Sequence, residues 1–356
     1  MSVHPVMPQT LRASFVEAHP NVRLLDGGHV GDLEAYLLER RVVQESELPI
    51  RVAPAGDGNM NLTLRVTLPG RSVILKQGRP WVEKYDHIAA PWGRTQIEGR
   101  FYRAALAAPG VSMRLPRLLD LDERNQILAL EDLGRDGDLS SIYRDGRLAT
   151  STLLDLLEWL AALARLDVPT DLREAFTNRE MRALNHAHMF EFPLDEHNGL
   201  DLDGITPGLA AAAGAVQRDR EYTSRVARLG ATYLSDGPRL VHGDFFPGSW
   251  VRTPDGVRVI DPEFCFLGSR EFDYGVMLGH LALCGERREF AEQVLASATA
   301  QRLDDSLVIG FAGTEIMRRL IGVAQLPLVC GIDVKRRMLD VSRQFVLSPE
   351  RGLPPW

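Results

Sequence analysis

Acidic residues in the second half of the chain have the spacing that phosphoryl transfer requires. The stretch LVHGDFFPGSWV places Asp244 five residues before Ser249, and the later stretch VRVIDPEF places Asp261 and Glu263 two residues apart after an apolar run. Phosphoryl transfer needs one carboxylate to orient and deprotonate the attacking hydroxyl, and others to hold Mg²⁺ against the phosphates. We therefore predict that Asp244 is the catalytic base and that Asp261, Glu263 and Ser249 are metal ligands.

The order of these residues matches a known catalytic pattern. Protein kinases carry H-R-D-x-x-x-x-N followed by D-F-G, which becomes H-G-D-x-x-x-x-S followed by D-P-E here. Ser249 takes the position of the metal-binding asparagine, and Glu263 supplies a second carboxylate that would compensate for the weaker hydroxyl ligand. Alone, Asp244 would more readily be a turn-capping residue than a base. The carboxylate pair downstream favours the catalytic interpretation, because paired acids beside apolar residues need a cation.

Lys76 is the candidate for the cation that binds the nucleotide phosphates. It lies inside the strand-like run SVILKQ, where a lysine is costly unless its ammonium meets phosphates or a carboxylate. Glu98, on the helix expected to follow, is a plausible ion-pair partner. The alternatives are a lysine that reaches solvent from an edge strand and a glutamate on the surface.

A glycine-rich stretch, AGDGNMN, precedes this strand. Its candidate ATP-binding residues are Gly56, Asp57, Gly58, Asn59 and Asn61. A turn of this composition brings backbone N–H groups to phosphates. An ordinary β-turn would use the same residues, so the position between strands and just before a strand lysine favours the phosphate-binding interpretation.

An arginine pair interrupts the apolar stretch TEIMRRLIGVAQL near the C-terminus. Arg318 and Arg319 are adjacent, and neighbouring residues on a helix point about 100° apart, so we expect at least one to face inward. An inward arginine would bind a substrate hydroxyl or stabilise charge on the transferring phosphoryl group. Two surface arginines beside a core stripe are the alternative.

Two patterns of hydrophobic periodicity along the chain, one strand-like and one helical, indicate which elements position these residues. The first third has strand-like runs at 50–53, 62–68 and 72–77, with a Pro69-Gly70 hairpin turn, then a helix at 93–106 and strands at 115–121 and 126–130. After the Gly- and Asp-rich stretch 131–140 the pattern is helical, with helices predicted at 153–166 and 209–229. One interruption remains, in which RLVHGDFF and VRVIDPEF are expected to flank the turn 253–256 as two strands.

Composition excludes several classes of protein. No apolar run is long enough to span a bilayer, and the N-terminus lacks a secretory signal, so we expect a cytoplasmic protein without membrane partners. A formal net charge of -7 gives no general attraction to nucleic acid. The cysteines, Cys265, Cys284 and Cys330, fit neither a disulfide framework nor a zinc site. Small molecules are therefore the expected partners.

Together these motifs resemble the aminoglycoside phosphotransferase and choline kinase superfamily, and within it the methylthioribose kinase family. The likeness spans nearly the whole chain. It is carried by Gly56–Asn61, Val73–Gln77, Pro80–Trp92, Leu130–Leu133, Asn178–Met181, His242–Ser249, Asp261–Phe264, Phe272–Gly275 and Glu315–Gly322.

The resemblance implies a bilobal, protein-kinase-like α+β fold, with a small N-lobe built on an antiparallel β-sheet at residues 1–133 and a larger, mostly helical C-lobe at residues 134–356. It implies an ATP- and Mg²⁺-dependent kinase that phosphorylates the anomeric hydroxyl of 5-methylthioribose in methionine salvage. Glu131 and Leu133 would belong to the hinge that binds adenine, while Arg318, Arg319 and Trp92 would face the sugar. Such kinases often form homodimers.

Departures from the family leave the acceptor open. Phe246 stands where the family usually has a histidine, the region 283–313 is shorter, and the tryptophan loop WVEKYDHIAAPW differs in its middle. The alternatives are a kinase for 5-deoxyribose or another pentose, for an aminoglycoside or for a choline-like amine, and a pseudokinase-like protein that binds ATP without transfer. The complete set of Lys76, Asp244, Asp261 and Glu263 argues against the last.

Overall fold

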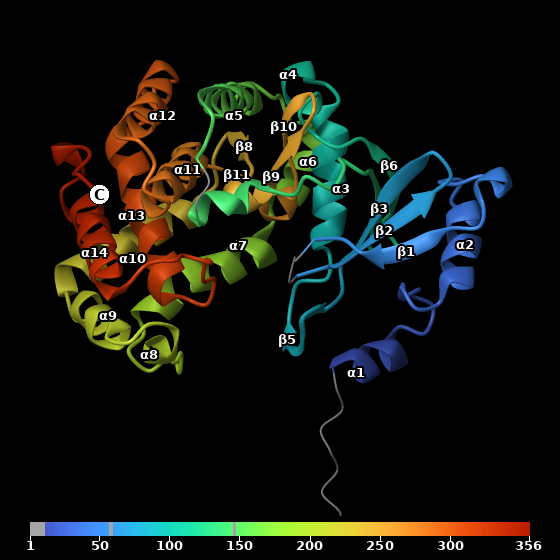
Figure 1. The fold of residues 1–356 in the computed structure, drawn as a ribbon, viewed down its shortest axis with the longest axis horizontal. Coiled ribbons are helices and arrows are strands. Elements are labelled where there is room, and N and C mark those ends of the chain that lie inside the picture. The colour runs from blue at the N-terminus through green and yellow to red at the C-terminus, as the bar shows by residue number, and fades with distance from the viewer. Residues whose placement is uncertain (1–10, 57–59, 145–146) are drawn as a thin grey trace, which may run out of the picture. The chain divides into compact units, whose positions relative to one another are not determined.

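The computed structural model describes residues 11–56, 60–144 and 147–356. The chain divides into two compact units (Figure 1). Met1–Arg103 and Pro116–Gly134 form the first unit, and Ala104–Leu115 and Arg135–Trp356 form the second. Asp57, Gly58 and Asn59, which were assigned to the phosphate-binding turn, lie outside the described residues.

The first unit is built on an antiparallel sheet with the strand order β1-β2-β3-β7-β6. Leu68 pairs with Arg71 across the Pro69-Gly70 turn, which confirms the predicted hairpin. The tryptophan loop forms a separate two-stranded hairpin, and two helices precede the sheet; neither feature was predicted. The elements are α1 (Leu11–Ala18), α2 (Val30–Glu39), η1 (Glu45–Glu47), β1 (Arg51–Pro54), β2 (Leu62–Leu68), β3 (Arg71–Gln77), β4 (Trp81–Val82), β5 (Tyr85–Ala89), α3 (Arg94–Ala105, whose last two residues belong to the second unit), β6 (Leu118–Asp122) and β7 (Ile127–Glu131).

Alternation along β3 determines where Lys76 points. Val73 and Leu75 belong to the apolar cluster that the sheet forms with α2. Successive side chains of a strand face opposite sides of the sheet, so Lys76 faces away from that cluster. On this other side lies α3, whose Gly99 closely approaches Leu121 and Leu128 (Figure 1).

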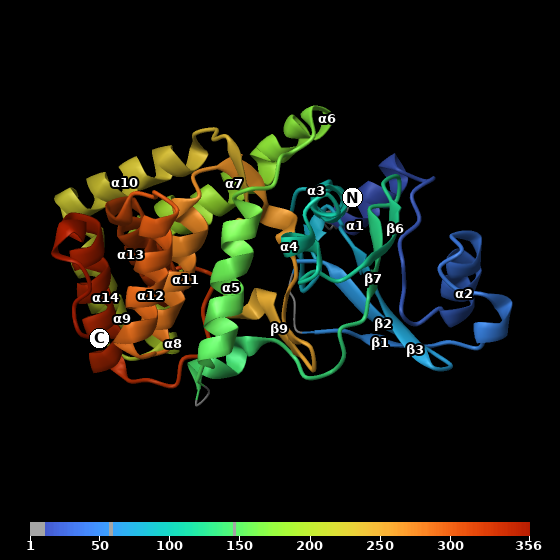
Figure 2. The ribbon, with the colours of Figure 1, turned by 90° about the horizontal axis from the view of Figure 1, so that it is seen from above.

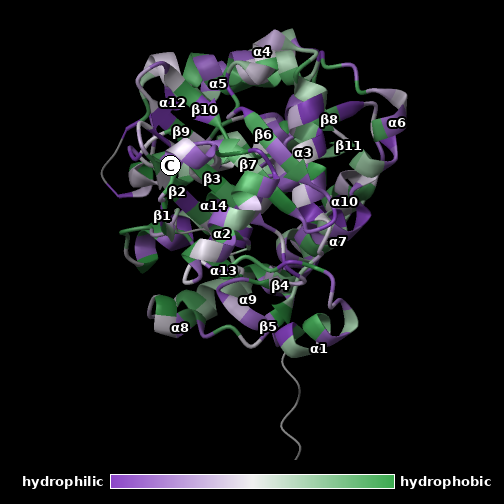
Figure 3. Ribbon diagram, turned by 90° about the vertical axis from the view of Figure 1, so that its right-hand side faces the viewer, coloured by the Kyte–Doolittle hydropathy of each residue, from purple (hydrophilic) through white to green (hydrophobic). Residues whose placement is uncertain are grey.

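The second unit is mainly helical. Its elements are α4 (Pro109–Ser112), η2 (Leu139–Tyr143), α5 (Thr150–Leu163), α6 (Thr170–Arg173), η3 (Ala175–Thr177), α7 (Arg179–His186), the π-helical turn η4 (Ala187–Glu191), η5 (Phe192–Leu194), α8 (Leu202–Ile205), α9 (Leu209–Gln217), α10 (Arg220–Leu234), β8 (Arg239–Val241), η6 (Pro247–Ser249), β9 (Trp250–Thr253), β10 (Gly256–Val259), η7 (Pro262–Phe264), β11 (Phe266–Gly268), α11 (Glu271–Leu283), α12 (Arg288–Ala300), α13 (Asp305–Ile321), α14 (Ile332–Leu347) and η8 (Pro349–Arg351). Most helices show both green and purple residues in Figure 3, as expected for elements with one buried and one exposed face.

The helix predicted at 209–229 is wrong as a single element. The chain forms α9 and α10 instead, because Asp219 accepts hydrogen bonds from the backbone N–H groups of Glu221 and Tyr222 and so caps a new helix. The alanine-rich composition hid this break, since apolar periodicity continues across it.

The expectation that RLVHGDFF and VRVIDPEF flank the turn 253–256 as two strands is also wrong in part. The hairpin joins β9 to β10, whereas β8, in the run RLVHGDFF, pairs with β11. The strand ends after Val241 because Gly243 has a φ of 85°, a conformation that glycine adopts without strain. The residues that follow form a loop and the turn η6 rather than a strand.

Helices α11, α12 and α13 run beside one another (Figure 2). Gly279 of α11 allows a close approach, since a Cβ there would lie 3.1 Å from Glu315 Cβ on α13. Because of this close approach, His280, the neighbour of Gly279, contacts Glu315. Within the described residues, no helix is long and apolar enough to cross a membrane.

Candidate active site

Lys76 and Glu98 form a buried ion pair in the first unit. Lys76 Nζ lies 2.6 Å from Glu98 Oε2, and the two side chains are 5% and 0% exposed. The pair joins β3 to α3 on the sheet face opposite α2. The expected partnership of these residues is therefore present, and the surface alternatives for both residues are excluded.

The described part of the glycine-rich turn is fixed by an arginine that the sequence analysis missed. Gly56 has a φ of 71°, in the region that favours glycine. Asn61 Oδ1 accepts a hydrogen bond of 2.7 Å from Arg94 Nε. Arg94 also donates to the carbonyl oxygens of Met60 and Arg79, so this one buried guanidinium ties the end of the turn to the start of α3.

The expected hinge and the tryptophan loop also belong to the first unit. Glu131 ends β7, and its Oε2 accepts a hydrogen bond from the backbone N–H of Arg117; Leu133 follows two residues later. The ring of Trp92 packs edge-on against Phe15, with a centroid distance of 4.9 Å. Its buried Nε1 has no hydrogen-bond partner among the described residues.

In the second unit, the loop that carries Asp244 is anchored by Asp273. The Asp273 carboxylate accepts hydrogen bonds of 2.7 and 3.0 Å from the backbone N–H groups of His242 and Gly243. Burial raises the pKa of Asp273 to about 7, although the two amide hydrogen bonds act in the opposite direction. Because Asp273 lies in the first turn of α11, the loop is fixed to the helical part of the unit.

His242 connects this loop to the segment that carries Asp261. The backbone N–H of Asp244 donates to His242 Nδ1 at 3.3 Å. Nδ1 is then an acceptor, so Nε2 carries the proton and donates to the carbonyl oxygen of Ile260 at 3.0 Å. One buried imidazole therefore sets the position of the Asp244 loop relative to the residue before Asp261.

Asp261 and Glu263 provide a donor set that suits Mg²⁺. Asp261 has a φ of 61°, a strained conformation for an aspartate that is commonly found at functional sites. Glu263 is buried on η7, and Asn178 Nδ2 donates to the carbonyl oxygens of Glu263 and Cys265. Mg²⁺ takes oxygen ligands and is often held by one or two carboxylates together with phosphates and water.

The remaining Mg²⁺ ligands would have to come from outside these two side chains. Among the described residues, no group of three or more His, Cys, Asp or Glu side chains is placed to hold a metal ion. The hydroxyl of Ser249 donates to the Asp244 carbonyl oxygen at 2.9 Å, which leaves the hydroxyl oxygen able to donate a lone pair. A two-carboxylate site completed by Ser249, phosphates and water fits the residues present.

Both arginines of the pair contact Asp244. Arg318 Nη2 lies 3.2 Å and Arg319 Nη2 3.4 Å from Asp244 Oδ1. The two arginine side chains are 6% and 7% exposed, while the Asp244 side chain remains 23% exposed. The alternative of two surface arginines is therefore excluded, and both guanidinium groups lie beside the candidate base.

Glu315 holds the other side of the arginine pair. Its two oxygens accept hydrogen bonds from Arg318 Nε at 2.6 Å and from Arg319 Nε at 2.7 Å. Burial raises the pKa of Glu315, but the two guanidinium groups and His280 outweigh this effect, so the pKa lies well below its usual range. Glu315 is therefore ionised, and each arginine bridges Glu315 and Asp244.

A buried histidine and tyrosine extend this network. His280 Nε2 lies 2.8 Å from Glu315 Oε1, and Nδ1 lies 2.6 Å from the Tyr143 hydroxyl. Burial lowers the pKa of His280 to about 4, so the imidazole is neutral at pH 7. Since ionised Glu315 can only accept, Nε2 carries the proton and Tyr143 donates to Nδ1.

Phe246, which stands where the family usually has a histidine, packs on the same network. Its ring lies 4.6 Å from the guanidinium carbon of Arg319, within the range of a cation–π contact. The ring centroid is 5.4 Å from that of His280. The aromatic side chain thus covers one face of the Arg319 guanidinium.

Sequence reasoning assigned no role to several residues of this site. Asp273, Asn178 and Glu315 lie in stretches that carry the family resemblance, so the resemblance was the signal that could have found them. Tyr143 and His280 lie outside those stretches. Only the packing of η2, α11 and α13 brings these two side chains to Glu315.

Comparisons with known proteins identify the family and the fold of the chain. The model of the phosphotransferase enzyme family (APH) matches residues 51–307. A methylthioribose kinase from Geobacillus kaustophilus is 28% identical over 358 residues, which cover 84% of this chain and 87% of the relative. An ethanolamine kinase structure from Plasmodium vivax has a TM-score of 0.53 at 11% identity and covers 98% of this chain and 99% of its own.

A spectinomycin phosphotransferase, solved in complex with ADP and spectinomycin, has a TM-score of 0.51 at 11% identity, covering 90% of this chain and 98% of its own. At such low identities these two structures support the fold alone. The antiparallel sheet and helical second unit of this chain match that fold, and the family match extends over most of the sequence. The chain therefore belongs to the phosphotransferase enzyme family, has its bilobal protein-kinase-like fold, and resembles the methylthioribose kinases within it.

Proposed function

We propose that this protein is an ATP-dependent sugar kinase that phosphorylates the anomeric hydroxyl of 5-methylthioribose in methionine salvage. The observation that carries the proposal is that Arg318 and Arg319 both contact Asp244 Oδ1. The loop that carries Asp244 is anchored by Asp273. A carboxylate held so firmly is suited to orient a hydroxyl group. The methylthioribose kinases among its relatives support this choice of acceptor.

In the proposed reaction, the acceptor hydroxyl oxygen forms a bond to the γ-phosphorus of ATP. The bond between that phosphorus and the β,γ-bridging oxygen breaks, ADP leaves, and the hydroxyl proton passes to Asp244. Because the arginines engage Oδ1, and no hydrogen bond from a described residue reaches Oδ2, we assign the proton to Oδ2.

The remaining roles follow the donor chemistry of each side chain. Lys76 would bind the nucleotide phosphates, with Glu98 holding its ammonium in place. Gly56, Asn61, Glu131 and Leu133, together with residues 57–59, would bind the rest of ATP. Asp261, Glu263 and Ser249 would hold Mg²⁺, which neutralises charge on the phosphates when bound.

The arginine pair also bears on the class of acceptor. Aminoglycosides and choline are cationic, and Asp244 attracts a cation less because its carboxylate is already paired with two guanidinium groups. A neutral sugar brings hydroxyl oxygens that accept hydrogen bonds from arginine. The proposal therefore places Arg318 and Arg319 at the sugar hydroxyls, and the role of Trp92 as a sugar contact stays a prediction.

ADP release by the purified protein with Mg-ATP would test the proposal. The acceptors are methylthioribose, 5-deoxyribose, ribose, choline and kanamycin, and ³¹P NMR of the product would identify the phosphorylated carbon. We expect turnover with methylthioribose and a phosphate on its anomeric oxygen. Preference for another pentose would retain the mechanism and change the acceptor, turnover with kanamycin or choline would contradict the role given to the arginines, and no turnover with any acceptor would favour a binding protein.

A further inference from the structure

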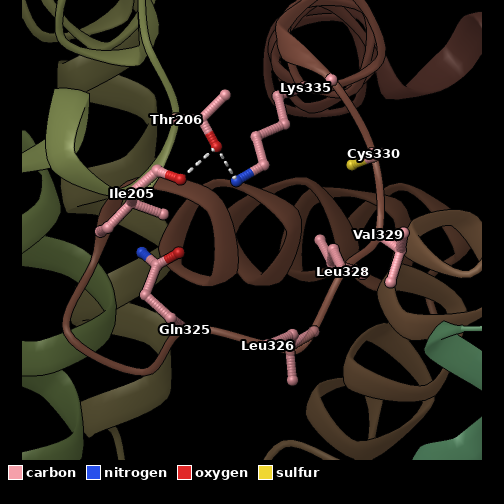
Figure 4. Close-up of a pocket in the computed structure, with 9 residues that line it drawn as sticks. Ile205, Thr206, Gln325, Leu326, Leu328, Val329, Cys330 and Lys335 are labelled. Carbon is pink, nitrogen blue, oxygen red and sulfur yellow. Dashed lines mark hydrogen bonds between the residues drawn. The ribbon is translucent and has the colours of Figure 1, made fainter.

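A groove in the second unit lies between the end of α8 and the segment that joins α13 to α14 (Figure 4). Its volume is about 610 Å³. The lining combines polar side chains with the apolar side chains of Ile205, Leu326, Leu328 and Val329, and Val329 is 79% exposed. The residues that line it are Ile205, Thr206, Gln325, Leu326, Leu328, Val329, Cys330, Gly331 and Lys335.

Lys335 places an ammonium group in this groove. The residue is 5% exposed, and its Nζ donates a hydrogen bond of 2.8 Å to Thr206 Oγ1. Thr206 in turn donates to the carbonyl oxygen of Ile205 (Figure 4). The partner of the ammonium is therefore a neutral hydroxyl, and two of its three N–H donors have no partner among the described residues.

No carboxylate among the described residues lies within 4.0 Å of Lys335 Nζ, in contrast to the ion pairs made by the buried arginines of α13. The charged groups of the described residues nearby do not replace this missing carboxylate. Asp333 is exposed and lies 3.7 Å from Arg336, and the N-terminus of α14 itself carries partial positive charge. Burial raises the pKa of the Cys330 thiol, and the Lys335 ammonium partly opposes that shift, so its charge is felt inside the groove.

A buried ammonium without a carboxylate partner is unfavourable and is rarely found without a bound anion. Leu326, Leu328 and Val329 line the same groove as this ammonium and offer an apolar surface for an uncharged part of a ligand. We propose that the groove binds a small monocarboxylate with a short aliphatic chain. Its carboxylate accepts hydrogen bonds from Lys335, and its chain lies against Leu328 and Val329.

Calorimetric titration of the full chain with sodium hexanoate, in a carboxylate-free buffer without nucleotide, tests this site independently of the kinase activity. We expect saturable binding of one hexanoate, weakened at least tenfold in Lys335→Met, whose side chain keeps the apolar bulk. Arg336→Met is the matched control: it removes a half-exposed charge one residue further along α14 and should bind hexanoate within twofold of the unchanged protein.

Three further measurements keep the test decisive if Lys335→Met folds poorly. Hexanol, which has the same chain without the charge, should bind the unchanged protein at least tenfold more weakly than hexanoate, and inorganic phosphate should not displace hexanoate at equal concentration. Hexanoate should also raise the melting temperature of the unchanged protein and of Arg336→Met. Equal binding of hexanol, displacement by phosphate, no saturable binding, or full binding by a folded Lys335→Met would each overturn the proposal.

Discussion

The two units hold their buried charges in different ways. In the first unit, one ammonium and one carboxylate, Lys76 and Glu98, join a strand to a helix. In the second, two guanidinium groups bridge two carboxylates, Glu315 and Asp244, and His280 with Tyr143 fixes the far side of Glu315. The first arrangement holds one positive charge in place. The second also fixes the orientation of the Asp244 carboxylate.

This difference matches the demands of the proposed reaction. A lysine is a compact charge on a flexible stem, and it can move between a carboxylate and a phosphate. An arginine presents a planar fork, so two arginines that share two carboxylates leave little freedom to any of the four groups. Phosphate binding needs charge, whereas proton transfer needs an oxygen held in place.

The largest effect is expected where the second network meets the acceptor. Asp244→Asn should fold normally but lower kcat by about 10³-fold, because the amide cannot accept the proton. Steady-state ADP release and circular dichroism would measure the two properties. Asp255→Asn, in the exposed turn between β9 and β10, is the control and should keep full activity. A kcat within tenfold of the unchanged enzyme would remove Asp244 from its role.

Removing the buried carboxylates compares the two networks directly. Glu315→Gln leaves the two arginines with Asp244 as their one carboxylate partner among the described residues. We expect it to lower the free energy of unfolding by about 4 kcal/mol and kcat by about 10²-fold. Glu98→Gln should lower the free energy of unfolding by about 3 kcal/mol and mainly raise KM for ATP. Urea unfolding and steady-state kinetics would separate the two variants. A Glu315→Gln enzyme with unchanged kcat would show that the arginines do not orient Asp244.

The two stability losses should also differ with pH. In Glu98→Gln, the ammonium of Lys76 can release its proton as pH rises, so the loss should shrink between pH 7 and pH 9.5. In Glu315→Gln the arginines stay charged over that range, so the loss should remain constant. Equal behaviour of the two variants in urea unfolding at both pH values would contradict the comparison.

Local patterns were sufficient for much of the first unit. Alternation in LTLRVTL and SVILKQ predicted the hairpin, and a lysine inside a strand pointed to a buried partner, which is Glu98. These features depend on neighbours in sequence. In the second unit, the sequence analysis missed the pairing of β8 with β11 and the helix break at Asp219. Hydrophobic periodicity does not encode the strand contact or the helix cap on which these two features depend.

The network around Asp244 was less accessible from the sequence. Its members come from η2, η6 and its preceding loop, α11 and α13, and they meet because Gly279 allows α11 to approach Glu315. The motif HGD indicated Asp244 as the candidate base, and the arginine pair was noticed for its apolar setting. His280 and Tyr143 carry no motif, so tertiary packing alone reveals them.

A smaller effect is expected from His280, whose contribution to the free energy of unfolding should depend on pH. Its pKa of about 4 lies below the usual value near 6.5, so the unfolded chain binds more protons than the folded one between these values. The contribution of His280 to stability is therefore complete above about pH 6.5 and is lost as pH falls toward 4. Relative to His280→Gln, the unchanged protein should lose about 2 kcal/mol more between pH 7 and pH 5.

Urea unfolding at the two pH values would measure this difference. His197→Gln, at an exposed position of the same unit, is the control and should follow the unchanged protein at both. If His280→Gln lost as much stability as the unchanged protein on acidification, the imidazole would not be held neutral by its surroundings.

The smallest effect tests whether the far end of the network positions the base or only stabilises the fold. Tyr143→Phe leaves His280 Nδ1 without its donor and should cost about 1 kcal/mol of unfolding free energy. Tyr222→Phe is the matched control, because the Tyr222 hydroxyl makes a buried hydrogen bond of 2.7 Å to Ser342 Oγ and should cost a similar amount. We expect Tyr143→Phe alone to lower kcat, by about threefold, with KM for ATP unchanged in both variants. If both variants kept the kcat of the unchanged protein, the residues that orient Asp244 would end at Glu315. Tyr143 would then contribute to stability alone.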